Sequence, residues 1–539
     1  MQLSLGNASG MAVGTLLSRI TGVIRDIALV AAIGTGIFSD TYSVANSIPN
    51  IIYILVAGGA INAVFVPALV RHMSDDADAG QAFTDQLLSV IAAVLLGIVA
   101  LSMLGAGFLI KLYATASWSS TDSHIATIFA LWCLPQIFFY GIYTVMSQVL
   151  NAREVFLAPM FAPIINNIIV IATAIVFLSF NSALPTTATV TSFQLTLLGA
   201  GTTLGVIAQA VILYPSLVKH GYAFSPRFKL AGLGQLGDLA LWTIGFVAVN
   251  QISFAIMARL STYANVLSAN NNAVEVGFTS YQKGQLMMML PHSIITVSLI
   301  TALLPRLSKQ SHSGDMHAFG TDLIRALKLV LALITPSAAL LFITGPRLGV
   351  LLYGRGASTY DQGWSLGFIA SMFALALPAF SVFYLLLRSY YAQENTKTPF
   401  LINLGLNILH VGFGLALFNL IDNINYKVAS LAVAYALAYS VTAVLTWYRV
   451  SNRLPELASS RLARHIVRTS LASIVAMILA SCAHLLLKSV ANLDNFFTQV
   501  LDLAITAGIF AAAYYFFATA MRIDEVKTVS TFFNRRNAQ

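Results

Sequence analysis

The sequence has very little charge for its length. Only 9% of its 539 residues are Asp, Glu, Lys or Arg, against about 25% in an average soluble domain. Apolar residues make up 58%, and the mean hydropathy is +0.80. A water-soluble fold of this size needs many more charged side chains to cover its surface. The composition therefore excludes a single soluble domain, a disordered chain and an extracellular disulfide scaffold, and leaves a polytopic membrane protein.

Cysteine and the common catalytic and metal-binding motifs are also scarce or missing. The two cysteines, Cys133 and Cys482, lie in apolar segments, so we expect inert thiols and no disulfide framework. No GxxxxGK[ST] phosphate loop is present, and ATP is therefore not expected to drive the protein directly. There is no HExxH motif and no paired His/Cys cluster. The sequence thus predicts neither an enzyme nor a bound metal or cofactor.

Long apolar stretches dominate what is present. A spanning helix needs about 20 mainly apolar residues, and the alternating pattern of a membrane barrel is absent, so we expect an all-α protein with about fourteen transmembrane helices. The first stretch carries Arg19 and Arg25 and lacks a small-residue cleavage site, so it is expected to remain as a helix. The predicted stretches are 8–33, 39–70, 84–112, 125–150, 157–180, 192–218, 236–260, 276–304, 321–344, 364–391, 399–420, 427–450, 467–489 and 498–521.

The basic residues indicate an orientation. With the N-terminus in the cytoplasm, twenty of the 29 Lys and Arg residues fall on the cytoplasmic side, six outside and three within spans. This bias predicts that both termini are cytoplasmic, and it explains the net charge of +9 without a nucleic-acid partner. The glycine-rich stretch 345–363 then lies outside, and we interpret it as a turn-rich loop. The basic segments 219–229 and 453–468 are either amphipathic helices on anionic lipid or plain orientation signals.

Part of the chain repeats itself. Four residues recur with a spacing of 240: Ala152, Glu154, Pro159 and Asn167 reappear as Ala392, Glu394, Pro399 and Asn407. We therefore predict two duplicated halves, an N-lobe of helices 1–6 (1–230) and a C-lobe of helices 7–12 (231–455), followed by helices 13 and 14 with a cytoplasmic tail (456–539). Halves with an even helix count share one orientation, and transporters built this way hold substrate between the halves near the midplane.

Charged residues inside the apolar spans need an explanation, because each costs a few kcal/mol at the bilayer centre. One interpretation is local neutralisation, in which Arg19 pairs with Asp26 and Arg25 pairs with Asp40, tying helices 1 and 2 together. The other is a wet, net-positive cavity lined by Arg19, Arg25 and Lys283, with Asp40 orienting an arginine. Such a cavity selects an anion, and the planar guanidinium group suits phosphate oxygens.

A proline interrupts the second predicted helix. Pro49 frees a backbone carbonyl and bends the helix between Asn46 and Asn50. The bend is either a packing kink or a hinge that exposes backbone near a substrate.

Several motifs carry a family resemblance. They are LLSRITGVIRDIALVAAIGTG, SDTYSVANSIPN and AVFVPALV in helices 1 and 2, FAPIINN at 161–167, NQIS at 250–253, the segment from Pro291 to Pro305, and RSYYAQENTKTP at 388–399. In this order they resemble the MurJ (MviN) family of lipid II flippases, of the MOP superfamily, over nearly the whole chain. The resemblance implies two six-helix lobes in a V and two further helices that form a groove for a lipid tail. It assigns substrate binding to Ser18, Arg19, Arg25, Asp40, Pro49 and Asn50.

The resemblance also implies the function. The substrate would be lipid II, an undecaprenyl-pyrophosphate-linked disaccharide pentapeptide, moved from the inner to the outer leaflet of a bacterial plasma membrane by alternating access for peptidoglycan synthesis. Membrane lipids and cell-wall synthesis proteins are the expected partners. Two alternatives remain open: a related exporter of another lipid-linked oligosaccharide or of drugs, and a non-transporting cell-wall scaffold. A cation exporter should place carboxylates in its cavity, whereas the cavity predicted here is positive.

The sequence departs from the family at some sites. Many members carry an arginine and a glutamate where this chain has Tyr53 and Gly58, and Gln285 and Leu286 replace part of an ADR motif in helix 8. Our hypothesis is that Lys283 supplies the lost charge. Some members bind sodium through Asn and Asp in helix 11; the candidates here, Asn403 and Asn407, include no aspartate, which argues against a sodium site.

Overall fold

The computed structural model describes residues 5–57, 80–180, 185–222, 224–228, 238–458, 460–490, 492–493 and 495–526. Every regular element in these ranges is a helix. The chain forms two compact units. Unit 1 comprises Met1–Asn270 with Gly277–Thr279 and Gly356–Ser358, and unit 2 comprises Asn271–Val276, Ser280–Arg355 and Thr359–Gln539. The division into lobes at residues 230 and 455 remains a prediction.

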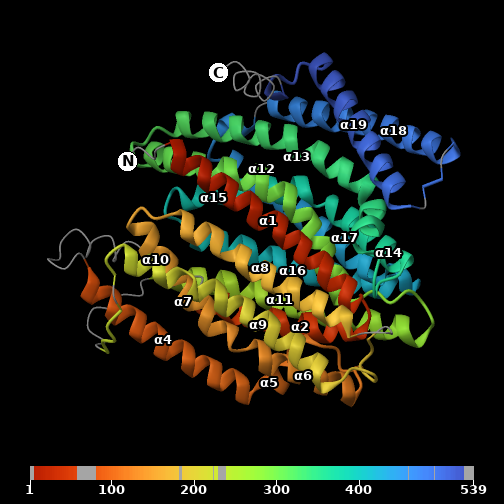
Figure 1. The fold of residues 1–539 in the computed structure, drawn as a ribbon. Coiled ribbons are helices and arrows are strands. Elements are labelled where there is room, and N and C mark those ends of the chain that lie inside the picture. The colour runs from red at the N-terminus through yellow and green to blue at the C-terminus, as the bar shows by residue number, and fades with distance from the viewer. Residues whose placement is uncertain are drawn as a thin grey trace. The chain divides into compact units, whose positions relative to one another are not determined.

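Unit 1 is a helical bundle (Figure 1). Its helices are α1 (Leu5–Ile33), α2 (Ile37–Ala57), α4 (Gln81–Leu104), α5 (Ala106–Tyr113), α6 (Ser120–Cys133), α7 (Gln136–Ala152), α8 (Leu157–Ser179), α9 (Ser192–Val211), α10 (Leu213–Lys219) and α11 (Asp238–Asn270). α8 packs between α1 and α9, and α2 packs on α6 and α7. The core between these helices contains Ile48, Phe129, Ile137 and Phe177, all fully buried.

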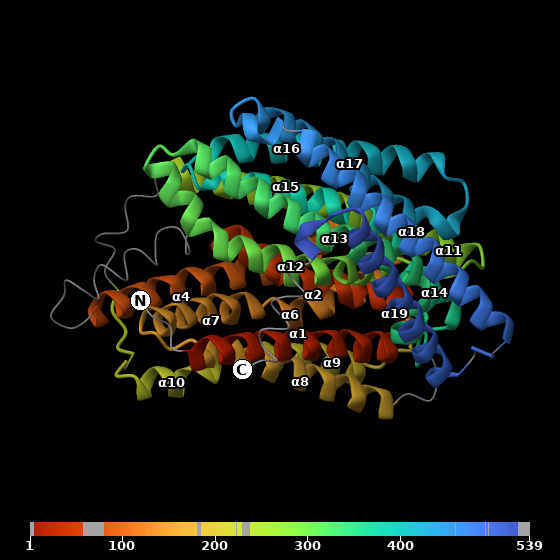
Figure 2. The ribbon, with the colours of Figure 1, turned by 90° about the horizontal axis from the view of Figure 1, so that it is seen from above.

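Unit 2 contains the remaining helices. They are α12 (Phe278–His312), whose first two residues belong to unit 1, α13 (Met316–Tyr353), α14 (Tyr360–Ala374), α15 (Leu377–Tyr391), α16 (Lys397–Leu420), α17 (Lys427–Ser451), α18 (Ser460–Val490), α19 (Phe496–Ala520) and the short 3₁₀ turns η2 (Ile424–Tyr426) and η3 (Pro455–Ala458). α18 and α19 form an antiparallel hairpin that packs on α13 (Figure 2).

The membrane-spanning prediction is confirmed. Among the described residues, eleven helices are long and apolar enough to cross a membrane, or twelve when α14 and α15, bent by 47°, count as one span. α1 and α2, of 29 and 21 residues, lie outside that count. With these two included, each of the fourteen apolar stretches corresponds to one helix or to one broken pair of helices.

The loop expected over residues 345–363 is mostly helix. α13 continues to Tyr353 and α14 begins at Tyr360, so only residues 354–359 connect them. The glycines of this stretch serve helix packing: a Cβ on Gly349 would lie 2.2 Å from the Gly363 carbonyl oxygen, and one on Gly367 would lie 2.1 Å from that of Gly345. Two small-xxx-small faces therefore allow α13 and α14 to touch backbone to backbone, and the glycine content was wrongly interpreted as turns.

Two local features recur with the spacing of the predicted repeat. Glu154 and Glu394, 240 residues apart, both adopt the left-handed region, with φ of 62° and 56°, which is uncommon for residues other than glycine. The helices α6 and α14 begin with capping boxes, at Ser119 and Thr359, that are again 240 residues apart. These segments therefore have the same local conformation, and the duplication of whole halves remains a prediction.

Candidate functional site

Arg25 lies on α1 and faces α8. Its Nη1 donates to the Asn167 side-chain oxygen at 3.1 Å, and its Nη2 lies 3.4 Å from a carboxylate oxygen of Asp26. The Asp26 side chain is buried, whereas 32% of the Arg25 side chain remains exposed. A guanidinium group has five N–H donors, and these contacts use only two of them. Arg25 is therefore positioned on one side while donors remain for a ligand on the other.

Asn167 fixes the register between α1 and α8. While its side-chain oxygen accepts from Arg25, its nitrogen donates to the Ser18 carbonyl at 3.1 Å and to the Thr21 hydroxyl at 2.9 Å. The two helices approach closely here, and a Cβ on Gly14 would lie 3.0 Å from the ring of Phe161. Sequence reasoning used Asn167 only as a marker of the repeat. Its place in FAPIINN, a motif of the family resemblance, was the signal that could have identified it.

Asp40 has a different environment from the one expected. The residue is completely buried in the first turn of α2. Its carboxylate accepts from the Asn265 side chain at 2.8 Å and from the backbone N–H groups of Phe278 and Thr279 at 3.0 and 2.8 Å. Within the described part of the chain Asp40 pairs with no arginine, so the expected Arg25–Asp40 pair is wrong, and Asp40 orients no arginine there.

The backbone near Asp40 is equally crowded. A Cβ on Gly277 would lie 2.0 Å from the Asp40 carboxylate, so only glycine lets the start of α12 come this close. The Thr279 hydroxyl adds hydrogen bonds to Ser39 and Ser43, at 3.1 and 2.9 Å. Asp40 thus caps the first backbone N–H groups of α12, where a negative charge is favoured by the helix dipole.

Polar side chains continue along α2 and α7. Asn46 accepts from Gln136 at 3.4 Å, and Gln136 also accepts from the Tyr140 hydroxyl at 3.2 Å. Tyr53 stands where many family members have an arginine, and its hydroxyl lies 2.5 Å from that of Thr144. Hydrogen-bonded neutral groups therefore occupy this face. The sequence analysis singled out none of the α7 residues that take part, which are Gln136, Tyr140 and Thr144.

The other predicted site residues are dispersed. Ser18 and Arg19 are half-buried on α1. Pro49 is buried within α2, which continues through it as a helix, and Asn50 is exposed. Lys283 is half-buried on α12 in unit 2. Its grouping with Arg19 and Arg25 remains a prediction, and Gly58 lies outside the described residues.

Metal-ligating side chains do not gather among the described residues. These residues contain no group of three or more His, Cys, Asp and Glu side chains that could hold a metal ion. The former sodium candidates, Asn403 and Asn407, are buried on α16, where Asn407 donates to the Asn403 carbonyl at 2.8 Å. The guanidinium group of Arg25 on α1 is held by the Asn167 amide and the Asp26 carboxylate, and it is partly exposed. Such a group suits a phosphate-bearing ligand.

The chain was compared with known proteins. The family model described as lipid II flippase MurJ matches residues 29–504. A probable lipid II flippase MurJ of Buchnera aphidicola is 27% identical over 498 residues, which is 91% of each chain. The lipid II flippase MurJ of Burkholderia cenocepacia is 28% identical over 403 residues, or 73% of this chain and 74% of that protein.

Solved structures share the fold. A lipid II flippase MurJ in an inward closed conformation superposes with a TM-score of 0.72 at 21% identity, covering 95% of this chain and 99% of the other. An inward-facing multidrug-resistance MATE transporter of the MOP superfamily gives 0.61 at 12% identity, covering 82% and 96%. The helix order, the open arginine on α1 and the family match over most of the length agree, and the chain belongs to the MurJ family of lipid II flippases.

Proposed function

We propose that this protein moves lipid II across the plasma membrane of a bacterium. The observation that carries the proposal is the family match over residues 29–504, which begins in the last turns of α1, just after Arg25, and runs into α19. The substrate is the undecaprenyl-pyrophosphate-linked disaccharide pentapeptide, and the product is the same molecule in the outer leaflet, where peptidoglycan is built.

Arg25 is the residue that we propose to bind the diphosphate. Its two contacts with Asn167 and Asp26 hold the guanidinium in place, and the exposed part of the side chain can donate to phosphate oxygens. Arg19, six residues earlier on the same helix, is half-buried and adds a second cation. Ser18 and Asn50 supply polar contacts to the head group. The isoprenoid tail stays in lipid beside α18 and α19.

Transport proceeds by alternating access. The cavity receives the head group from the cytoplasmic side, the two duplicated halves rock, and the cavity opens outward. Both termini lie in the cytoplasm, as the distribution of basic residues predicts. Lys283 on α12 contributes the positive charge that other family members place elsewhere. Cell-wall synthesis proteins take up the exported lipid.

The test is complementation of cells depleted of their own lipid II flippase, with export measured as lipid II accessible outside. We expect Arg25→Ala to abolish growth and export at normal expression. Arg325→Ala is the matched control, because Arg325 is exposed on α13 and, in the part of the chain that the structure describes, pairs with Asp322 at 3.6 Å. Full growth and export with Arg25→Ala would exclude the diphosphate role. Growth without export would favour the scaffold, and export of a different lipid-linked sugar would favour the related exporter.

A further inference from the structure

A second group of ionisable side chains lies within the helices of unit 2, away from the proposed diphosphate site. Arg347 lies six residues before the end of α13, His484 six before the end of α18, and Asp502 six after the start of α19. Six residues of helix rise by about 9 Å. The three helices therefore bring these side chains together at a similar distance from their ends, inside segments that are otherwise apolar.

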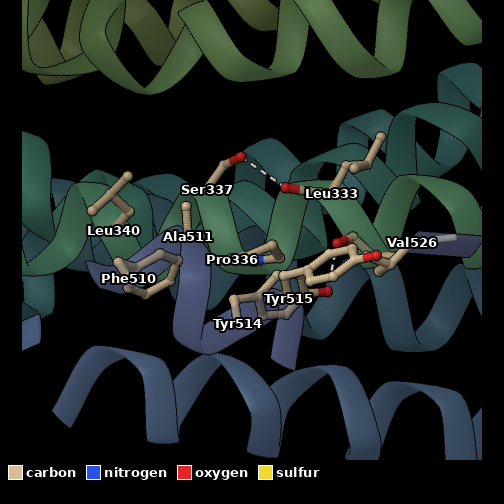
Figure 3. Close-up of a pocket in the computed structure, with 10 residues that line it drawn as sticks. Leu333, Pro336, Ser337, Leu340, Phe510, Ala511, Tyr514, Tyr515 and Val526 are labelled. Atoms are coloured by element: carbon tan, nitrogen blue, oxygen red, sulfur yellow. Dashed lines mark hydrogen bonds between the residues drawn. The ribbon is translucent and has the colours of Figure 1, made fainter. Parts of the chain in front are cut away.

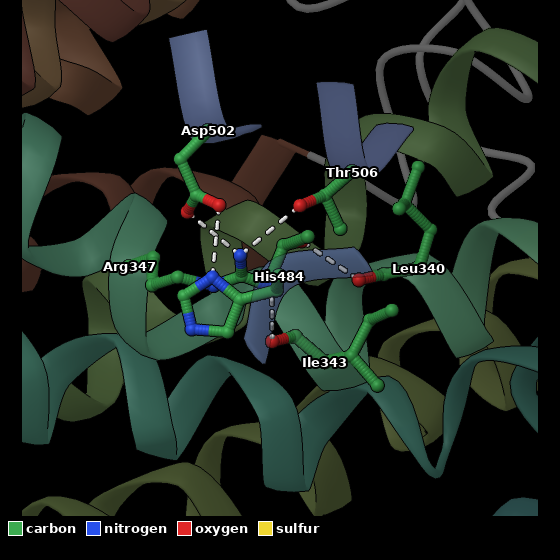
Figure 4. Close-up of polar contacts among 7 residues, drawn as sticks. Leu340, Ile343, Arg347, His484, Asp502 and Thr506 are labelled. Carbon is green, nitrogen blue, oxygen red and sulfur yellow. Dashed lines mark hydrogen bonds and ion pairs between the residues drawn. The ribbon is translucent and has the colours of Figure 1, made fainter. Parts of the chain in front are cut away.

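The contacts within this polar cluster are short and specific (Figure 4). Arg347 Nη1 donates to one carboxylate oxygen of Asp502 at 2.8 Å and to the Thr506 hydroxyl at 3.2 Å. His484 Nδ1 lies 2.8 Å from the other carboxylate oxygen of Asp502. Arg347 Nη2 also donates to the Ile343 carbonyl at 3.2 Å. Asp502 is 3% exposed, Arg347 20% and His484 21%, so the carboxylate is sealed while parts of the guanidinium and imidazole side chains remain exposed.

The cluster joins the α18–α19 hairpin to α13. Asp502 on α19 receives one bond from α13 and one from α18, so a single carboxylate connects all three helices. The same helices also share an apolar cluster, in which Ala332, Ala472 and Ala476 lie beside larger side chains such as Phe510 and Tyr514. The small residues let the helices approach closely. The ionic contacts add directional bonds to this packing and so contribute to the spacing between the hairpin and α13.

An apolar groove lies next to the cluster between α13 and α19 (Figure 3). It encloses about 340 Å³, with Pro336 and Leu340 on one wall and Phe510 and Tyr514 on the other. The Tyr514 hydroxyl donates to the Ala332 carbonyl at 2.6 Å, so its polar atom is satisfied within the wall. Leu340 is about two turns from Arg347, and Phe510 is about one turn from Thr506. The groove thus begins within about two turns of the cluster on both of its walls.

The charged groups around His484 are few. α18 packs on α13 and α19. From α13 the facing charge is Arg347, from α19 it is Asp502, and on α18 itself Lys488 lies one turn further along. A neutral imidazole donates to Asp502 from Nδ1 when Nδ1 carries the proton. Protonation keeps that bond and adds a positive charge on the donor, so that a hydrogen bond to an anion becomes an ion pair and is strengthened. Imidazole is the side chain that ordinarily titrates between about pH 5 and pH 8.

We propose that Arg347, His484 and Asp502 form a positioning cluster that holds the α18–α19 hairpin against α13, and that this attachment tightens when His484 takes up a proton. The cluster sets the width of the groove between α13 and α19. The proposal goes beyond lipid II transport and does not depend on it, because it concerns the spacing of three helices within one unit.

The experiment measures the distance between α18 and the start of α14, which packs along α13. Spin labels are attached to cysteines introduced at Tyr360 and Leu486, both exposed, in the full chain in lipid nanodiscs. Cys482 is exposed and is replaced by serine, while Cys133 is buried and stays. We expect the pulsed-EPR distance distribution to become shorter and narrower at about pH 5 than at about pH 8.

His484→Asn is the matched variant, since its amide nitrogen reaches the position of Nδ1 and donates one neutral hydrogen bond but cannot be protonated. We expect its distribution to be the same at both pH values. Asp502→Asn, which removes the acceptor charge, should give a broad distribution at both. A wild-type distribution that ignores pH, or a His484→Asn distribution that shifts as the wild type does, overturns the proposal. None of these readouts requires transport, so a failed flippase test leaves them unaffected.

Discussion

Arg25 and Asp40 are charged residues in apolar helices, and they differ in exposure and in hydrogen-bond partners. Arg25 is a third exposed and contacts both the Asp26 carboxylate and the neutral Asn167 amide. Asp40 is fully buried and its three donors are all groups of the protein. A buried charge is stable only when its hydrogen bonds are satisfied. Arg25 thus keeps capacity for a ligand, whereas Asp40 uses its capacity on the fold.

Asn167 can be tested by truncation. Asn167→Ala removes the acceptor of Arg25 and the donor to Ser18 and Thr21, and leaving such groups unsatisfied costs about 1–3 kcal/mol. We expect a lower midpoint in thermal unfolding of the purified protein. Asn419→Ala is the control, because Asn419 is exposed on α16, and exposed substitutions usually change stability by less than about 0.5 kcal/mol. Equal midpoints for the two variants would contradict the role given to Asn167.

A second prediction concerns the hydrogen bonds of the Asp40 carboxylate. Asp40→Asn replaces one accepting oxygen by an NH₂ group that faces the donors of Asn265, Phe278 and Thr279. Hydrogen bonds to a charged group contribute about 1.5–3 kcal/mol, and we expect a loss of this order in the free energy of unfolding, measured by denaturant titration. The same change at Asp422, which is exposed outside the helices, should be neutral. A neutral Asp40→Asn would show that the carboxylate is not ionised in its site.

The sequence could identify these two residues but could not assign their partners. A charge in an apolar stretch is conspicuous from composition alone. Its partner is set by tertiary contact: Asn167 follows Arg25 by 142 residues, and Asn265 follows Asp40 by 225. Opposite charges on helices 1 and 2 made the Arg25–Asp40 pair the simplest guess. Neutral amides, which carry no comparable signal in the sequence, took both places.

At the scale of elements, glycine decides which helices can touch. Gly345 and Gly349 on α13 face Gly363 and Gly367 on α14, and the separations leave no room for a Cβ. Arg347 lies between the first two glycines, and two residues turn a helix by about 200°, so it points away from α14 toward the hairpin. One short segment of α13 therefore carries a close helix contact on one side and the polar cluster on the other.

The glycine contact can be tested with a matched pair. Gly349→Ala would place a Cβ 2.2 Å from the Gly363 carbonyl oxygen, whereas Gly405→Ala on α16 meets nothing within 4 Å. Overpacking of this kind costs about 1–3 kcal/mol, while alanine in an open helical position is favoured over glycine by up to about 1 kcal/mol. We expect the unfolding midpoint to fall for Gly349→Ala and to hold or rise for Gly405→Ala. The reverse order would exclude the backbone contact.

Hydropathy predicted the elements well and their ends poorly. In the part of the chain that the structure describes, each of the fourteen apolar stretches coincides with helix, because a chain in lipid must satisfy its backbone internally. The segment 345–353 was assigned to a loop because Gly and Pro ordinarily mark turns. Glycines are also required where two helices pack backbone to backbone, as α13 and α14 do. The sequence of one segment cannot tell such a helix from a turn, because the difference lies in the partner helix. Broken helices such as α6–α7 and α14–α15 likewise leave no mark in a hydropathy count.

At the scale of the whole molecule, the duplication organises the chain. The turns at Glu154 and Glu394 and the caps at Ser119 and Thr359 repeat with the same spacing of 240 residues. The sequence identities that first indicated the repeat are few, yet the local conformations agree across it. The charged site is not duplicated with the fold. The residue 240 positions after Arg25 is Asn265, which is uncharged and lies on α11. Its side chain donates a hydrogen bond to Asp40.

Charge movement gives a prediction for the protein as a whole. A diphosphate head that crosses the bilayer carries negative charge, and each charge gains about 2.3 kcal/mol per 100 mV when it moves toward the positive side. Purified protein in proteoliposomes with fluorescent lipid II should therefore export faster when a potassium diffusion potential makes the donor side negative, and slower when its sign is reversed. Arg25→Ala should abolish transport at either sign, because it removes the cation that we propose to bind the head group. Rates independent of the sign would show that no net negative charge crosses the bilayer with the head group and would contradict this prediction.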